Sequence, residues 1–126
     1  MMLVLAVAFG GALGAVARHF AVGAVNTASA GVFPYGTLTV NVIGSFVIGA
    51  LMETMALKWQ VSQEMRAFMI TGVLGGFTTF SAFSFDVLKL VDTNQFLPAA
   101  IYVAASVLLS LAAVFAAVHL FRGVFA

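Results

Sequence analysis

One amide side chain stands inside an otherwise apolar stretch of this sequence, where it could bind a ligand. Asn41 follows Thr37 and precedes Ser45 by one helical turn each, so the three side chains share one helical face. In lipid, an amide must find partners for its two N–H donors and its carbonyl acceptor. Asn41 therefore predicts either a hydrogen bond that holds two helices together or a donor that lines a pore.

Three hydroxyl side chains form a second polar line near the end of the chain. Tyr102, Ser106 and Ser110 recur every fourth residue in a stretch that is mostly Ala, Val and Leu. Small serines are also common at helix–helix contacts in membranes, where they let backbones approach closely. Three hydroxyls in register favour a polar track, with simple packing as the alternative.

Two phenylalanines follow a run of hydroxyls in the middle of the chain. Phe80 and Phe83 lie three residues apart, close to Thr78, Thr79 and Ser81. An aromatic ring has a positive edge around a negative face, so rings presented edge-on favour a small anion without offering it a formal charge. Packing in the core is the default alternative for any such pair. Combined with amide and hydroxyl donors, these rings predict a pathway that is rich in donors and free of anionic side chains.

Charged and metal-binding side chains are scarce, which excludes several kinds of site. The chain has no Cys, two separated histidines and four carboxylates, so we expect no redox or zinc centre and no catalytic site. It has no basic patch with interleaved aromatics and no GxxxxGK[ST] motif, which argues against nucleic-acid binding and ATP-driven pumping. Arg18 and Asp86 stay open: each is either functional or an anchor at the end of a helix.

The low number of charges also indicates where these side chains lie. Of the 126 residues, 63% are hydrophobic and 7% are charged, against about 25% charged in a typical soluble chain. A bilayer core takes about 20 apolar residues in a helix, and the uncharged windows accommodate four such spans. We therefore predict an all-α, multi-pass membrane protein with a single transmembrane domain, residues 1–126. A cleaved signal peptide is not expected, because no positive residue precedes the first apolar run.

Prolines, glycines and charges set the predicted boundaries of the spans. Pro34 marks the start of the second span, since proline is tolerated in the first turn of a helix. The third span contains Gly75 and Gly76 followed by hydroxyls, at a depth where unwound backbone must be buried or line a cavity. We expect this helix to be broken near 75–79. The four spans are predicted at about 2–22, 36–57, 66–91 and 96–121.

Basic residues are almost evenly divided between the two ends of such a bundle. With four spans, Lys58, Arg66 and Arg122 lie on the side of the two termini. Arg18 and Lys89 lie on the other side. A clear excess of Lys and Arg on one side normally sets a single orientation. The near-balance predicts that the chain inserts both ways and that two copies pair as an antiparallel, dual-topology homodimer.

Three motifs stand out along the chain: GGxxGxxxR at 10–18, GTLxVNxxGSF at 36–46 and GxxGGFTTFSAFS at 72–84. Together they resemble the Fluc (CrcB) family of fluoride channels, and the likeness covers essentially the whole chain. The third motif is the most specific of the three. The resemblance implies a fluoride-selective channel in the bacterial inner membrane, which lets cytoplasmic fluoride leave passively. It also implies an antiparallel homodimer with two narrow pores.

The resemblance further implies roles for individual residues. The fluoride pathway would be formed by Asn41, Phe80, Phe83, Tyr102, Ser106 and Ser110. A structural sodium ion at the centre of the dimer would be held by main-chain carbonyls of Gly75 and Thr78 from both subunits. Supporting roles would fall to Arg18, Thr37, Thr79, Ser81 and Asp86.

Two residues depart from the pattern of that family. Ala82 stands where a threonine is usual, which removes one hydroxyl near the pore or the dimer interface. Asp86 stands where a glutamate is more usual, which shortens the carboxylate by one methylene. Both changes could alter the rate of conduction, and neither obviously abolishes it.

Two other functions are compatible with four short spans. A small multidrug-type, proton-coupled exporter depends on a carboxylate in its first span, and residues 2–22 contain no Asp or Glu. A non-transporting membrane assembly subunit would use the same small-residue contacts, but it would not need a broken third helix. These two functions are the alternatives to a fluoride channel.

Overall fold

The four apolar windows of the sequence form four long helical segments in the computed structural model, which describes residues 1–126. The first two are α1 (Met2–Ser29) and α2 (Tyr35–Leu57), and the fourth is α6 (Phe96–Phe125). The third span consists of α3 (Gln63–Arg66), the π-helix η1 (Ala67–Leu74), α4 (Gly75–Phe77) and α5 (Phe80–Asp92). All four are long and apolar enough to cross a membrane, so the predicted all-α, four-span architecture is confirmed.

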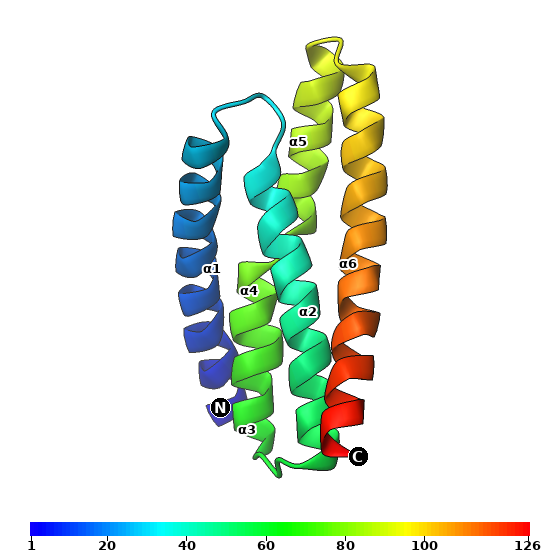
Figure 1. The fold of residues 1–126 in the computed structure, drawn as a ribbon. Coiled ribbons are helices and arrows are strands. Elements are labelled where there is room, and N and C mark those ends of the chain that lie inside the picture. The colour runs from blue at the N-terminus through cyan, green and yellow to red at the C-terminus, as the bar shows by residue number, and fades with distance from the viewer.

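The third span changes neighbours halfway along its length. Its first half, from α3 to α4, lies against α1, whereas α5 lies against α6 (Figure 1). Helix α2 runs through the middle of the bundle and packs chiefly on α6. Both termini and the α2–α3 loop lie at one end, and the α1–α2 and α5–α6 connections lie at the other. The two halves of the third span are therefore held by different helices.

The first helix is longer than the sequence suggested. It continues through the polar residues 26–29 to Ser29, instead of ending near residue 22. The reason is local hydrogen bonding: Ser29 Oγ donates to the Val25 carbonyl oxygen at 2.9 Å, and Asn26 Oδ1 accepts from the Gly36 N–H at 2.9 Å. Ala30 then ends the helix in the left-handed conformation, with φ 46°. These polar side chains cap the helix and join it to α2.

Glycines bring α1 and the third span into backbone contact. A Cβ atom on Gly14 would collide with the Val73 carbonyl oxygen, and one on Gly10 would collide with that of Phe68. On the opposite helix, a Cβ on Gly76 would lie 2.5 Å from the Gly11 carbonyl oxygen. The small-residue pairs therefore serve close helix packing, as expected in a bilayer, where apolar surface alone does not drive association.

The break in the third span is shorter and slightly later than predicted. Gly75 and Gly76 are helical, and no glycine in the chain has a positive φ. The extended residues are Thr78, with φ −87° and ψ 158°, and Thr79, with φ −155° and ψ 124°. The glycines thus provide close contact, and the two threonines provide the interruption.

Candidate functional site

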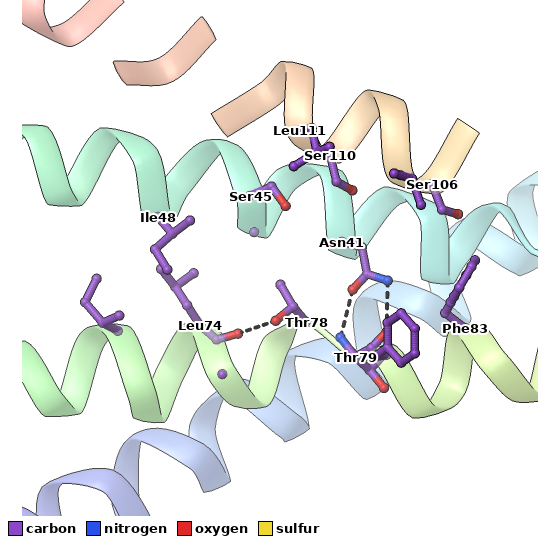
Figure 2. A pocket seen from close by; sticks show the side chains of 15 residues that line it. Asn41, Ser45, Ile48, Leu74, Thr78, Thr79, Phe83, Ser106, Ser110 and Leu111 are labelled. Atoms are coloured by element: carbon purple, nitrogen blue, oxygen red, sulfur yellow. Dashed lines mark hydrogen bonds between the residues drawn. The ribbon is translucent and has the colours of Figure 1, made fainter. Parts of the chain in front are cut away.

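A groove of about 470 Å³ lies where α2, the break and α6 meet, and we call it the central groove (Figure 2). None of its 15 lining residues is charged. They are Asn41, Gly44, Ser45, Ile48, Ile70, Leu74, Gly75, Thr78, Thr79, Phe80, Phe83, Ser106, Val107, Ser110 and Leu111. The structure thus brings most of the predicted pathway and sodium residues to one surface.

Asn41 pairs with the backbone of the break. Its Nδ2 donates to the Thr79 carbonyl oxygen at 3.0 Å, and its Oδ1 accepts from the Thr79 N–H at 2.8 Å (Figure 2). Because one partner is an acceptor and the other a donor, the orientation of the amide is fixed. Both alternatives for Asn41 are therefore compatible with the structure: the side chain holds two helices together, and its second N–H remains available at the wall of the groove.

The two threonines of the break end one helix and start the next. Thr78 donates both its N–H and its hydroxyl to the Leu74 carbonyl oxygen, at 3.0 and 2.9 Å. Thr79 is the N-cap of α5, and its hydroxyl accepts from the Ala82 N–H at 3.1 Å. Its contact with Ser81 Oγ, at 3.3 Å, places that predicted supporting residue on the exposed side of the cap.

Several backbone groups at the break are without their usual helical partners. The Thr78 carbonyl oxygen accepts no hydrogen bond, and the Thr79 N–H, the helical partner of the Gly75 carbonyl, is bonded to Asn41 instead; Gly75 and Thr78 both line the central groove. The N–H groups of Phe80 and Ser81 lie in the first turn of α5, where a helix offers them no partner. The first turn of a helix carries a partial positive charge, and the last carbonyls of a helix carry a partial negative charge. The break therefore presents both cation-binding and anion-binding groups within a few residues.

Two serines on α6 also lack partners within the chain. Ser106 is 7% exposed, and its Oγ is the one buried side-chain polar atom without a hydrogen bond. Ser110, two turns after Tyr102, lines the same groove and makes no side-chain hydrogen bond. A buried hydroxyl without a partner is costly, so such atoms call for a ligand or an ordered water.

Tyr102 is placed differently from the rest of the predicted track. It is fully buried and does not line the central groove. Its ring packs on Phe83, with centroids 5.1 Å apart, and Phe83 packs on Phe80 at 5.4 Å. Its hydroxyl donates to Asp86 Oδ2 at 3.0 Å. The straight line of hydroxyls predicted from the sequence is thus interrupted, because the Phe83 ring lies between Tyr102 and the groove.

The Asp86 carboxylate has one partner on each of its oxygens. Its side chain is 13% exposed, with Tyr102 on one oxygen and Lys89 Nζ 3.7 Å from the other. Lys89 also lies over the Phe85 ring, 5.1 Å from its centroid. The carboxylate is therefore paired inside the bundle and does not simply anchor a helix end.

Arg18 lies within α1, away from the end of the helix, which favours the functional alternative over the anchor. It is about three turns before Ser29, and its Nε donates to the Gly76 carbonyl oxygen at 2.9 Å. A cation at a helix C-terminus stabilises the free carbonyls there. Arg18 also borders a second hollow of about 350 Å³, together with Thr37, Thr79 and Ala82. Arg18 therefore cannot be counted as a loop charge. At the end of the bundle opposite the termini, Lys89 is then the one basic residue near a loop.

Two features of the structure were absent from the predicted site. Ser45 lines the central groove one turn beyond Asn41, a position that the helical spacing already indicated. Glu53 on α2 forms a bidentate ion pair with Arg122 on α6, with N···O distances of 2.7 and 3.2 Å. That pair joins residues far apart in the sequence, so no local pattern could have revealed it.

The sequence also matches a known protein family. Residues 5–118 match the family described as CrcB-like protein, Camphor Resistance (CrcB). This chain belongs to the CrcB family. The family covers nearly all of the four spans, from the first turn of α1 to the last third of α6.

Relatives within the CrcB family carry a more specific name. A protein of Rhizobium johnstonii is 48% identical over 122 residues, covering 97% of this chain and 98% of that protein. One of Rhodospirillum centenum is 50% identical over 122 residues, covering 97% of both chains. One of Rhizobium meliloti is 52% identical over 120 residues, covering 94% of this chain and 95% of that protein. Each is named "Fluoride-specific ion channel FluC". The chain is accordingly a multi-pass bacterial membrane protein of the CrcB family.

Proposed function

We propose that this protein is a fluoride-selective channel for the passive exit of fluoride from the cell. The observation that carries the proposal is the central groove, whose polar lining consists of amide, hydroxyl and backbone groups without a single carboxylate. An anion is attracted by donors and repelled by carboxylates, so this lining suits an anion. The fluoride-channel name of relatives that are 48–52% identical over almost the full chain supports fluoride as the ion.

Fluoride can leave through a simple conduit without coupling to another energy source. It enters cells as neutral HF, ionises in the more alkaline cytoplasm and is then trapped as an anion. A negative-inside membrane potential favours the exit of one negative charge by about 2.3 kcal/mol per 100 mV. A channel that stabilises the dehydrated ion through several weak donors allows both entry and release. Asn41, Phe80, Phe83, Ser106 and Ser110 would line this path, with Tyr102 behind Phe83.

We also propose that two copies assemble antiparallel around the break. In the single chain Phe80 is 78% exposed and borders the groove, so a second copy is needed to enclose a path. With Arg18 excluded from the loops, the basic residues divide three against one, which is a clearer bias than the sequence suggested. The proposal of dual topology thus rests mainly on the resemblance. Reporter fusions at the C-terminus should report both orientations, and a single orientation would refute it.

A sodium ion between the two copies is a further part of the proposal. The Thr78 carbonyl oxygen accepts no hydrogen bond, the Gly75 carbonyl has lost its helical partner to Asn41, and both residues border the groove, so these oxygens suit a cation that prefers oxygen ligands. One chain offers two such oxygens, and a second copy would offer two more. Exchange of Na⁺ for a bulky organic cation should then lower the thermal stability of the dimer. An unchanged unfolding midpoint would refute the sodium site.

The decisive experiment uses purified protein in liposomes. Vesicles loaded with KF or with KCl are diluted into an isotonic medium without the loaded halide, valinomycin is added, and ion-selective electrodes follow the efflux. We expect fast release of fluoride and retention of chloride. Retained fluoride, or equal release of both ions, would refute the proposal. A proton-coupled exporter would instead move an organic cation against its gradient, for which α1 offers no Asp or Glu.

A further inference from the structure

We propose that Ser45 is an additional residue of the ion pathway and that its hydroxyl extends the line of donors on α2 beyond Asn41. The inference rests on the proposed fluoride channel and adds a position to it. It is carried by the place of Ser45 in the central groove, by the absence of a hydrogen bond from its hydroxyl to its own helix and by the apolar wall that follows it.

Ser45 lies on the same wall as the polar groups already described. It follows Asn41 by one turn of α2, which is about 6 Å along the helix axis. In Figure 2 its hydroxyl projects from α2 among the lining side chains, as the Ser110 hydroxyl does from α6. Donors from two helices therefore border the same section of the groove.

The Ser45 hydroxyl is not used for packing within its own helix. A serine or threonine in a helix commonly donates to the carbonyl one turn earlier. Thr54 on the same helix does so, with its Oγ1 2.7 Å from the Ala50 carbonyl oxygen, and so does Ser84 on α5 at 3.0 Å. Ser45 makes no such bond. Thr37 and Thr39 also lack one, but neither of them lines the groove.

Beyond Ser45 the groove becomes apolar. The next lining residue on α2 is Ile48, and Ile70, Leu74 and Leu111 surround that section. Ser45 is thus the last hydroxyl of α2 that lines the groove toward the end of the bundle where the termini lie. An anion that leaves the donors near Asn41 would meet the apolar wall one turn sooner without this hydroxyl.

The test compares two substitutions at this position with a matched serine elsewhere. Ser45→Ala removes the hydroxyl with little change in volume, and Ser45→Thr keeps it. Ser29→Ala is the control, because Ser29 donates to Val25 at the exposed end of α1 and lies outside the groove. Fluoride efflux from liposomes is measured with all variants at equal protein content, and dimer content is measured by light scattering.

We expect Ser45→Ala to slow fluoride efflux by about ten- to a hundredfold, the loss that follows from one missing hydrogen bond to a charged ligand. Ser45→Thr and Ser29→Ala should keep at least half of the wild-type rate. Wild-type efflux by an assembled Ser45→Ala dimer would overturn the inference while leaving the channel intact. If the wild-type protein itself retains fluoride, the proposed function fails first. If Ser45→Ala does not assemble, Ser45→Cys takes its place, because cysteine has a similar size and is only a weak donor. Slowed fluoride efflux would then support the inference, and wild-type efflux would overturn it.

Discussion

The pairing of Asn41 with the backbone of Thr79 makes a quantitative prediction. Asn41→Leu keeps most of the side-chain volume and removes both hydrogen bonds, which leaves the Thr79 N–H and carbonyl without partners. Each bond contributes about 0.5–1.5 kcal/mol, and an unpaired group in an apolar surrounding costs about 1–3 kcal/mol. We expect a loss of about 2–4 kcal/mol in stability and a clear fall in the thermal unfolding midpoint in detergent.

Asn41→Asp separates this structural role from a role in the ion path. A carboxylate still accepts from the Thr79 N–H, but its second oxygen faces the Thr79 carbonyl oxygen where the amide donated, so the loss of stability should be about equal to that for Asn41→Leu. A negative charge about 5 Å from the ion, at an effective dielectric constant of about 20, raises its energy by about 3 kcal/mol. That corresponds to a rate lower by about a hundredfold. Asn41→Asp should therefore match Asn41→Leu in stability and yet conduct fluoride less.

The liposome assay and the unfolding midpoint together test this order. If conduction followed stability in both variants, Asn41 would act on the fold alone and would not face the ion. If Asn41→Leu matched the wild type in both measurements, the pairing with Thr79 would not contribute and the reasoning would be refuted.

Three further predictions follow from contacts elsewhere in the bundle. Gly14→Ala places a methyl group against the Val73 carbonyl and should destabilise the protein by about 1–3 kcal/mol, whereas Gly23→Ala, with open space around it, should be neutral or stabilising in the same thermal scan. Arg122→Ala should lower the unfolding midpoint more than Glu53→Gln. Its loss leaves the Glu53 carboxylate, which is only 11% exposed, without a partner, whereas Glu53→Gln leaves Arg122, which is 63% exposed and can be solvated. Equal effects of the two variants, or no recovery in the double variant, would contradict this. Tyr102→Phe removes the donor to Asp86 Oδ2 and should slow fluoride efflux by about three- to tenfold with the dimer intact, and an unchanged rate would show that this bond does not matter for conduction.

Most of the architecture could be predicted because it follows from composition. Charge-free windows give the number of spans, since a bilayer leaves few other places for 63% hydrophobic residues. The break was predictable within a few residues from Gly75, Gly76 and the threonines after them. The boundary of α1 was not, because Asn26 looks like a loop residue until its side chain is seen to accept from the Gly36 N–H.

The candidate site was predictable in its residue types but not in its contacts. Helical spacing placed Asn41, Ser106 and Ser110 on inward faces, and all three line the groove. The same spacing put Tyr102 in that line, yet the Tyr102 ring packs behind Phe83, and no local pattern marks the π-helix η1 in the third span. The partners of Asn41 and Arg18 lie 38 and 58 residues away in sequence, so only the folded chain reveals them.

The exchange of hydrogen bonds at the break explains why a channel would interrupt a helix here. In an unbroken helix the Thr79 N–H would bond to Gly75 and the Phe80 N–H to Gly76. Instead, Asn41 takes the Thr79 N–H, and Arg18 takes the Gly76 carbonyl. The Gly75 carbonyl thereby loses its helical partner, and the Phe80 N–H lies in the first turn of α5, where the helix offers it none; both residues line the groove.

Side chains from α1 and α2 thus satisfy the groups that would otherwise restore the helix, and the remaining acceptor and donor are freed for ligands. Lipid tolerates such free groups only beside protein or water, which the groove provides. If this account is right, the break is a rigid feature. Arg18→Gln and Asn41→Leu should then each increase hydrogen exchange at the backbone amides of the break, and protection equal to that of the wild type would show that these side chains do not hold it.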